Sequence, residues 1–300
     1  MTGNTGNTGN TGNTGNTGNT GNIGGDGWFI ADRVDLPFAT RIDAQTGGEL
    51  GERRRTAVTN FNDRQWAANW YAWRALHEFI ANKPDWAAII DADQQFTTIR
   101  TDLIAGYDHQ ITELVLAARD ERPDAMGLIL AQDGEFFTDF LSVLTARPGS
   151  HPKTWRVLHI ASLIGSFAAL FFKDKYDLPR PTQLCPALLP PIPVPGHSSW
   201  PSGHATQAHL MKKLMIRVFR VAMAFTNGTA MSTGDADVLI ANLTVLADEI
   251  ARNREIAGLH YGADSAAGAR LAELLDGILT AAVASKLDAM IAAAALEWRP

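Results

Sequence analysis

Two histidines in one short segment are the first residues whose types could do chemistry. The segment VPGHSSWPSGHAT, residues 194–206, places His197 seven residues before His204 and puts Ser202 and Gly203 directly in front of the second histidine. By itself this pattern fits an ordinary helix start with Ser202 as the N-cap. The first amides of a helix also bind anions, and a glycine there lets the backbone approach a ligand closely.

A pair of cations precedes this segment. In KDKYDLPRP, Lys173 and Arg180 stand on either side of a turn that Pro179 and Pro181 stiffen. A solvated helix end, with Lys173 favoured by the helix dipole, explains the same residues without any function.

A third cluster follows in NREIAGLHYGADSAAG, residues 253–268. Arg254 and His260 are six residues apart, so an unbroken helix would not point them together, but Gly258 offers a break. If a new helix starts near His260, Asp264 lies four residues later on the same face and accepts the proton of one imidazole nitrogen. The other nitrogen is then free to bind a ligand. A surface arginine and a buried His-Asp pair are the structural alternative.

The three clusters occur together and in order, and this joint pattern is specific. It resembles the superfamily of type 2 phosphatidic acid phosphatases, bacterial nonspecific acid phosphatases and vanadium-dependent haloperoxidases. The resemblance covers roughly residues 150–270 and implies an all-α helical bundle of that type. One position departs from the family: Asn253 stands where many members have a serine before the arginine. Asparagine also donates and accepts hydrogen bonds, so only the detail around the arginine is affected.

The residue types suit a trapped tetrahedral oxyanion, either vanadate or phosphate. Such an anion is stable in a buried site only when cations and donors surround it. Lys173, Arg180 and Arg254 supply three positive charges, and the Ser202 hydroxyl and the Gly203 amide add neutral donors.

The two histidines of the motifs have opposite expected roles. His260, held by Asp264, presents a neutral nitrogen, either as the nucleophile toward phosphorus or as the axial ligand of vanadium. His204 is the acid-base residue on the other side, which protonates a leaving alkoxide or takes and returns the protons of peroxide.

His197 is the residue that separates the two enzyme classes. The resemblance implies a histidine at this place in algal bromoperoxidases and an aromatic residue in fungal chloroperoxidases, and acid phosphatases match the stretch HSSWPSGH less well. We expect His197 to help position halide or to tune the bound peroxide through its protonation near neutral pH. A loop histidine in solvent is the alternative.

These residues predict a vanadium-dependent haloperoxidase with vanadate as cofactor. It would oxidise bromide, with chloride and iodide left open, using hydrogen peroxide to form a hypohalite-like species that halogenates an organic acceptor. The alternative is an acid phosphatase that hydrolyses phosphate monoesters through a phosphohistidine at His260. A protein that only binds an oxyanion is a third interpretation, but binding alone would not need both His204 and His260.

Helices are expected to position these clusters, and no segment reads convincingly as a sheet. The predicted helical stretches lie near 85–120, 123–146, 153–174, 203–225, 235–256 and 260–297. A further stripe recurs at spacings of three and four and is predicted to face the core; it consists of Trp66, Trp70, Trp73, His77 and Ile80.

The most apolar run, residues 157–172, is shorter than a bilayer span and reads as a buried core helix. We interpret His159 within it, and His209, as packing or helix-surface residues. The stretch 181–195 holds six prolines and cannot be a helix. A polyproline ligand for a partner is one interpretation. Its apolar residues favour a rigid loop that packs on the body and fixes Arg180 relative to Ser202.

The remaining predictions come from composition and organisation. Residues 1–25 carry seven copies of Thr-Gly-Asn and are expected to be disordered. Residues 26–60 are expected to form an irregular wrap, and 61–300 a single all-α catalytic domain. The net charge of −6 argues against a nucleic-acid partner or an anionic lipid surface. The single Cys185 makes no internal disulfide, no signal sequence is seen, and cytoplasmic location is the default with export left open. A homodimer is compatible with the sequence.

Overall fold

The computed structural model describes residues 66–226, 230–281 and 285–299, together with 41–42, 45–46 and 49–50. The predicted Thr-Gly-Asn tail and most of the predicted wrap lie outside these residues. Within the wrap, β1 (Arg41–Ile42) pairs antiparallel with β2 (Glu49–Leu50), and Arg41 lies opposite Leu50. No strand was expected here, because two-residue strands are too short to leave a periodic pattern. This hairpin belongs to a unit of its own, Thr14–Trp66.

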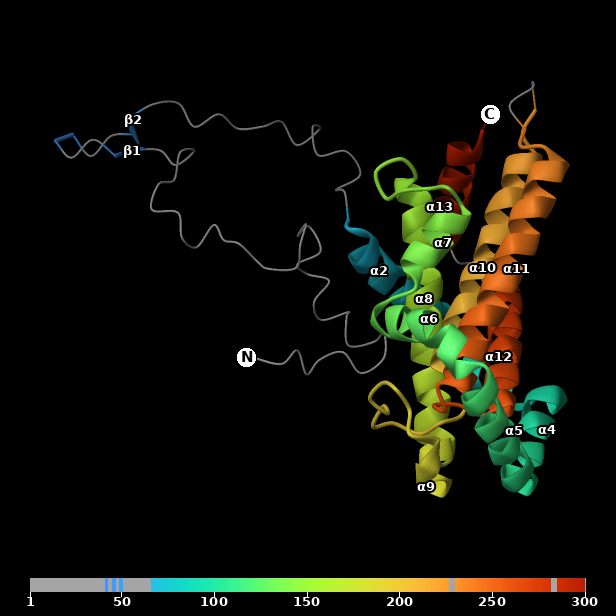
Figure 1. Ribbon diagram of the computed structural model, residues 1–300. Helices are drawn as coiled ribbons and strands as arrows, with labels where there is room; N and C mark the ends of the chain where they lie inside the picture. Colours follow the sequence, from blue (N-terminus) through green and yellow to red (C-terminus); the bar gives the residue numbers. More distant parts are fainter. Residues whose placement is uncertain are drawn as a thin grey trace. The chain divides into compact units, whose positions relative to one another are not determined.

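The residues from Ala67 onward belong to one compact unit, and all regular structure described there is helical (Figure 1). The α-helices are α2 (Ala68–Asn82), α3 (Trp86–Asp91), α4 (Gln94–Ala105), α5 (Tyr107–Asp120), α6 (Arg122–Gly134), α7 (Phe137–Val143), α8 (Pro152–Tyr176), α9 (Pro181–Leu184), α10 (Gly203–Met223), α11 (Thr233–Ile256), α12 (Gly262–Ala281) and α13 (Ser285–Ala295). Two 3₁₀ turns are η5 (Pro186–Leu188) and η6 (Leu296–Trp298). The predicted all-α class is therefore confirmed.

Short polar caps divide the longer predicted stretches. The expected stretch 85–120 is three helices, because Asp93 caps α4 by accepting the amide of Phe96 at 2.8 Å and Gly106 separates α4 from α5. Ser232 starts α11 in the same way. The stretch 181–195 was predicted to contain no helix, yet α9 forms there because Pro181 occupies the first helical position, where no amide hydrogen is needed.

Helix α10 packs against α8, α11 and α12, and Figure 1 shows these helices side by side. Two glycines allow the closest approaches. A Cβ on Gly268 of α12 would lie 2.8 Å from the carbonyl oxygen of Ser202, and a Cβ on Gly165 of α8 would lie 3.2 Å from the Cα of Gln207. The first turns of α10 are therefore held between the backbones of α8 and α12.

Helix α8 matches the expected core helix. The stretch Pro152–Leu184 has the length and hydropathy of a membrane-crossing helix, but 61% of its most apolar window is buried against the rest of the protein. Its Phe172 is fully buried and contacts Phe96 at a centroid distance of 5.2 Å. The Pro-rich segment that follows packs on the body through Leu188 and Ile192, and Arg122 donates to the Leu188 carbonyl at 2.8 Å.

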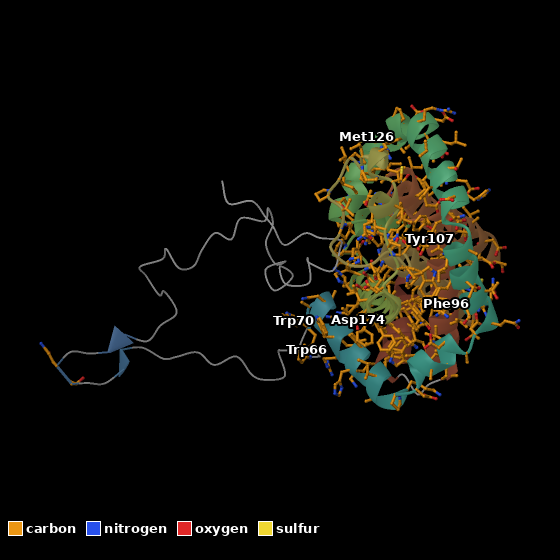
Figure 2. The ribbon with its side chains drawn as sticks, turned by 90° about the horizontal axis from the view of Figure 1, so that it is seen from below. Trp66, Trp70, Phe96, Tyr107, Met126 and Asp174 are labelled. Atoms are coloured by element: carbon orange, nitrogen blue, oxygen red, sulfur yellow. The ribbon has the colours of Figure 1, made fainter. Side chains whose placement is uncertain are left out.

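The predicted tryptophan stripe is wrong, because α2 buries a different face. Trp66, Trp70, Trp73 and Ile80 are between 38% and 48% exposed, and His77 is exposed as well. Figure 2 shows Trp70 at the edge of the helical body, whereas Phe96 lies inside it. The buried residues of α2 are Asn69, Ala72, Ala75, Leu76 and Phe79. Both faces satisfy helical spacing, and the one rich in small residues lets α2 lie close to α8.

Candidate oxyanion site

The end of α8 delivers Lys173 into the protein interior. This lysine lies in the last turn of α8 and is 2% exposed. Its Nζ donates to the carbonyl oxygens of Ser198 at 2.8 Å and Ser199 at 2.5 Å. After α8, Asp177 adopts a left-handed conformation with φ 44°, and the chain turns back toward Arg180, the N-cap of α9. The turn that Pro179 and Pro181 stiffen thus places Lys173 and Arg180 together, as the sequence predicts.

The guanidinium of Arg180 donates hydrogen bonds mainly to groups of the protein itself. Nε donates to the carbonyl oxygen of His197 at 2.8 Å, and Nη1 donates to that of Leu259 at 2.9 Å. Nη2 donates to Nδ1 of His197 at 3.0 Å. Arg180 is thus a buried charge, as the sequence predicts, and it also joins the 197–198 segment to the turn before α12.

The start of α10 carries the Ser-Gly-His motif as predicted. Ser202 caps the helix through its Oγ, which accepts the amide of Ala205 at 3.4 Å, and its own amide donates to the carbonyl oxygen of Asp264 at 3.0 Å. Nε2 of His204 lies 3.1 Å from the carbonyl oxygen of Gln132. A carbonyl only accepts, so this nitrogen carries the proton, and in neutral His204 Nδ1 holds the lone pair.

Arg254 reaches the site from the last turn of α11, and two of its guanidinium nitrogens make no hydrogen bond to the described residues. It is fully buried, and its Nη2 donates to the carbonyl oxygen of Ile129 at 2.8 Å. Nε and Nη1 have no hydrogen-bond partner among the residues that the structure describes, and the Asp133 carboxylate lies 4.0 Å from Nη1. Nε and Nη1 are therefore the buried donors of Arg254 that remain available for a further hydrogen bond.

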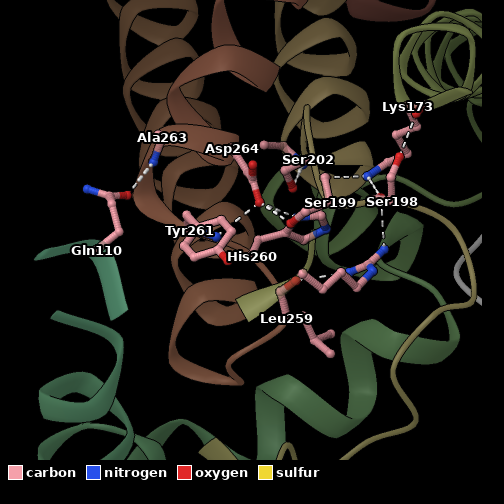
Figure 3. Close-up of polar contacts among 12 residues, drawn as sticks. Gln110, Lys173, Ser198, Ser199, Ser202, Leu259, His260, Tyr261, Ala263 and Asp264 are labelled. Atoms are coloured by element: carbon pink, nitrogen blue, oxygen red, sulfur yellow. Dashed lines mark hydrogen bonds and ion pairs between the residues drawn. The ribbon is translucent and has the colours of Figure 1, made fainter. Parts of the chain in front are cut away.

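The predicted break between Arg254 and His260 is present. Helix α11 ends at Ile256, and α12 begins at Gly262. Gly258 between them has φ 81°, the left-handed region that glycine enters without strain. In the turn that follows, Nδ1 of His260 lies 2.9 Å from Oδ2 of Asp264 (Figure 3). The proton therefore lies on Nδ1, and Nε2 keeps its lone pair.

One cavity collects most of the predicted site residues. Its volume is about 500 Å³ including the space at its open mouth. The predicted residues that line it are Lys173, Arg180, His197, Gly203, His204, Arg254 and His260. Asp264 lies behind His260, and Ser202 lies behind the first turn of α10; both are fully buried and do not line the cavity. Residues from all three sequence clusters thus face one space.

Burial and mutual repulsion keep the histidines of the cavity neutral. Burial, followed by the charge of Arg254, lowers the pKa of His204 to about 3. The pKa of His260 also lies well below its ordinary value because of burial and the charges of Lys173 and Arg180. For His197, burial and the charges of the same two cations lower the pKa to about 4, below the titration near neutral pH that we expected from the sequence.

Burial lowers the pKa values of the cationic residues of the cavity and raises that of its one carboxylic acid. Burial lowers the pKa values of Arg180 and Arg254 to about 10, so both stay charged at neutral pH. The pKa of Lys173 falls well below its ordinary value because of burial and the neighbouring Arg180. Burial raises the pKa of Asp264 to about 6, which leaves it ionised at neutral pH. The cavity is thus an electropositive space with one carboxylate behind its histidine wall.

The cavity fits an oxyanion by three observations. Nε and Nη1 of Arg254 are unpaired donors. A Cβ on Gly203 would meet no atom within 4 Å, so this glycine leaves open space beside the first amides of α10. Nε2 of His260 offers a single lone pair. Among the residues that the structure describes, no group of three or more His, Cys, Asp or Glu side chains is placed to hold a metal cation. The donors present suit vanadate or phosphate.

Some contributors carry no recognisable sequence signal. Ser198 and Ser199 accept from Lys173 through main-chain oxygens, and Gln132 and Asp133 of α6 lie far from every motif in sequence. Asn253, the departure from the family pattern, donates to Oε1 of Gln132 at 2.9 Å. Asn253 therefore helps to hold the α6 segment whose carbonyl orients His204.

No protein-family model matches this chain, and no curated protein matches it either. The family suggested by the motifs stays a prediction, and the function is argued below from the geometry of the cavity.

Proposed function

We propose that this protein is a vanadium-dependent haloperoxidase that oxidises bromide with hydrogen peroxide. The observation that carries the proposal is the cavity wall. Unpaired donors of Arg254, the buried charges of Lys173 and Arg180, and the lone pair of His260 face the same space as His204. The overall reaction, Br⁻ + H₂O₂ + H⁺ → HOBr + H₂O, needs one proton to be taken up and the protons of peroxide to be moved.

In this proposal the cationic residues bind the oxyanion, and His260 orients it. Lys173, Arg180 and Arg254 neutralise the charge of the oxyanion, and Arg254 has two donors available for its oxygens. His260 directs Nε2 at the anion because Nδ1 is held by Asp264. Vanadate, when bound, supplies a Lewis acid that polarises peroxide for oxygen transfer and keeps its oxidation state.

His204 is the proton carrier of the proposal. Its Nε2–H is held by the carbonyl oxygen of Gln132, so Nδ1 is the nitrogen that takes and returns a proton. Burial, followed by the charges of Arg254, Lys173 and Arg180, lowers the pKa of His204 to about 3. An anion bound among these cations offsets the part of this shift that their charges cause, and it thereby raises the pKa of His204 and favours proton uptake.

A phosphomonoesterase is the second candidate, and the His260–Asp264 pair favours it equally well. A neutral imidazole held by a carboxylate is an activated nucleophile toward phosphorus. His204 would then protonate the leaving alcohol. The His197 side of the cavity is what favours the haloperoxidase, because this residue lines the cavity and contacts Arg180 without being needed for phosphate transfer.

One paired assay separates the candidates. Purified protein is stripped of bound anions and given orthovanadate, peroxide and bromide, and bromination of a cyclic diketone dye is followed. A second sample is given a nitrophenyl phosphate without vanadate. We expect vanadate-dependent bromination that His260→Ala abolishes, with little phosphatase turnover. Phosphatase turnover without bromination would overturn the proposal in favour of the second candidate. Phosphate binding with neither activity would leave a protein that only binds oxyanions.

A further inference from the structure

Ser199 occupies a place between the cation and the His-Asp pair. It is fully buried, and its hydroxyl donates to Oδ2 of Asp264 at 2.5 Å. Its carbonyl oxygen accepts from Nζ of Lys173. One residue therefore contacts both sides of the site, which Figure 3 shows as a continuous set of contacts from Lys173 through Ser199 to His260.

The main chain of Ser199 is held independently of its side chain. The Ser199 amide donates to the carbonyl oxygen of Leu178 at 2.9 Å, and the carbonyl is held by Lys173. Loss of the hydroxyl therefore leaves the loop in place. What changes is the environment of Asp264.

Three donors converge on a single oxygen of Asp264. Oδ2 accepts from the Ser199 hydroxyl, from Nδ1 of His260 at 2.9 Å and from the amide of Tyr261 at 3.0 Å, whereas the buried Oδ1 has no hydrogen-bond partner within the described part of the chain. The Ser199 oxygen also lies 3.4 Å from Nδ1 of His260. Without the hydroxyl, the carboxylate loses its shortest contact and gains freedom to rotate its unpaired oxygen.

We propose that Ser199 is a positioning residue that locks the carboxylate of Asp264 and thereby keeps the proton of His260 on Nδ1. The inference rests on the proposed function, because the value of this tautomer is the lone pair that it leaves on Nε2 for an oxyanion. Ser199 does not line the cavity, and its hydroxyl acts through Asp264 and His260.

The chain supplies a matched control at the neighbouring position. The hydroxyl of Ser198 donates to the main-chain carbonyl oxygen of Lys173 at 2.6 Å, and no contact joins this hydroxyl to Asp264 or His260 among the described residues. Ser198→Ala and Ser199→Ala thus each remove one hydroxyl from the same loop. Only the second removes a donor from the His-Asp pair.

The test uses the full chain without vanadate at pH 7.5. Imidazole ¹⁵N spectra, assigned with His260→Ala, should show the Nδ1–H tautomer of His260 in the wild type and in Ser198→Ala. Ser199→Ala should show a mixture of tautomers. Calorimetric titration with inorganic phosphate should give an affinity roughly tenfold or more weaker for Ser199→Ala than for Ser198→Ala.

The outcomes are separable from those of the proposed function. An unchanged His260 tautomer in Ser199→Ala overturns the positioning role, whatever the activity of the protein. A wild type that shows the tautomer but binds neither phosphate nor orthovanadate counts against the proposed function, and the spectra of the variants still decide the role of Ser199. Should Ser199→Ala not fold, Ser199→Cys retains a similar size with a weaker donor, and the same tautomer mixture is expected.

Discussion

Asp264 holds both histidine-bearing segments of the site. Its carboxylate oxygen Oδ2 lies 2.9 Å from Nδ1 of His260, and its main-chain oxygen accepts the Ser202 amide, two residues before His204. The first contact fixes a side chain and the second fixes the start of a helix. Because the second contact uses the backbone, substitutions at Asp264 can test the first one separately.

Asp264→Asn should weaken the site without dismantling it. The neutral amide accepts from Nδ1 of His260 less strongly than a carboxylate does, so it fixes the tautomer of His260 less firmly. We expect phosphate or orthovanadate affinity to fall roughly 10–100-fold, measured by titration, while the helix content is kept. Wild-type affinity in this variant would mean that the His-Asp pair is only structural.

Arg254→Ala should remove the largest share of anion affinity. This arginine is buried, and its Nε and Nη1 make no hydrogen bond to the described residues, so its loss costs about 2–5 kcal/mol of binding free energy. Arg252 is the matched control, because it lies two residues earlier on α11 and pairs with Glu121 and Glu255 instead. Arg252→Ala should bind orthovanadate like the wild type. Equal losses in the two variants would show that the anion responds only to overall charge.

Gly203→Ala should block the cavity while the fold stays intact. A Cβ there meets no atom within 4 Å, so stability should stay the same or rise slightly, and the methyl group occupies space beside the anion. Gly127→Ala on α6 is a control with equally open surroundings. Gly268→Ala, by contrast, places a Cβ 2.8 Å from the Ser202 carbonyl oxygen and should lower the melting temperature. Unchanged phosphate affinity in Gly203→Ala would place the anion elsewhere.

His159 should contribute to acid sensitivity independently of the site. It packs between Phe137 and Trp155, its Nε2 has no partner, and burial lowers its pKa to about 4. The unfolded chain, with a histidine pKa of about 6.5, binds this proton more tightly. The contribution of neutral His159 to the free energy of unfolding is therefore fully present above about pH 6.5, and it is lost as the pH falls toward 4.

His159→Phe removes this dependence. The melting temperature of the variant relative to the wild type should stay constant from pH 8 to about pH 7 and rise as the pH falls from there to 5, and added phosphate should not alter the trend, because His159 does not line the cavity. A difference that stays constant across this pH range would contradict the assignment.

Motif spacing and helix-breaking residues could be read from the sequence, because their causes are local. Gly258 predicted the break before His260, and Ser202 predicted the start of α10. The Trp70 face of α2 could not be placed, since both of its faces have helical spacing and only the packing against α8 decides between them.

The hydrogen-bond partners of Arg180 could not be predicted from the sequence either. Three main-chain oxygens, those of His197, Ser198 and Leu259, accept from its guanidinium. Every residue type carries such an oxygen, so no motif marks it. The sequence therefore predicts which charged residues lie together, and the structure adds which of their donors already make hydrogen bonds within the protein.

His197 offers the sharpest test between the two enzyme candidates. Its Nδ1 accepts from Nη2 of Arg180, while its carbonyl oxygen accepts from Nε and stays in place when the side chain is removed. In His197→Ala, orthovanadate affinity should therefore fall only slightly. If the protein is a haloperoxidase, halide oxidation should change in rate or in preference for bromide over chloride, because the imidazole lines the cavity beside the bound oxyanion. Phosphate-ester turnover by a phosphatase should hardly respond. The measurement pairs steady-state bromide and chloride oxidation with orthovanadate titration, and unchanged halide kinetics at intact affinity would remove the argument that favours the haloperoxidase.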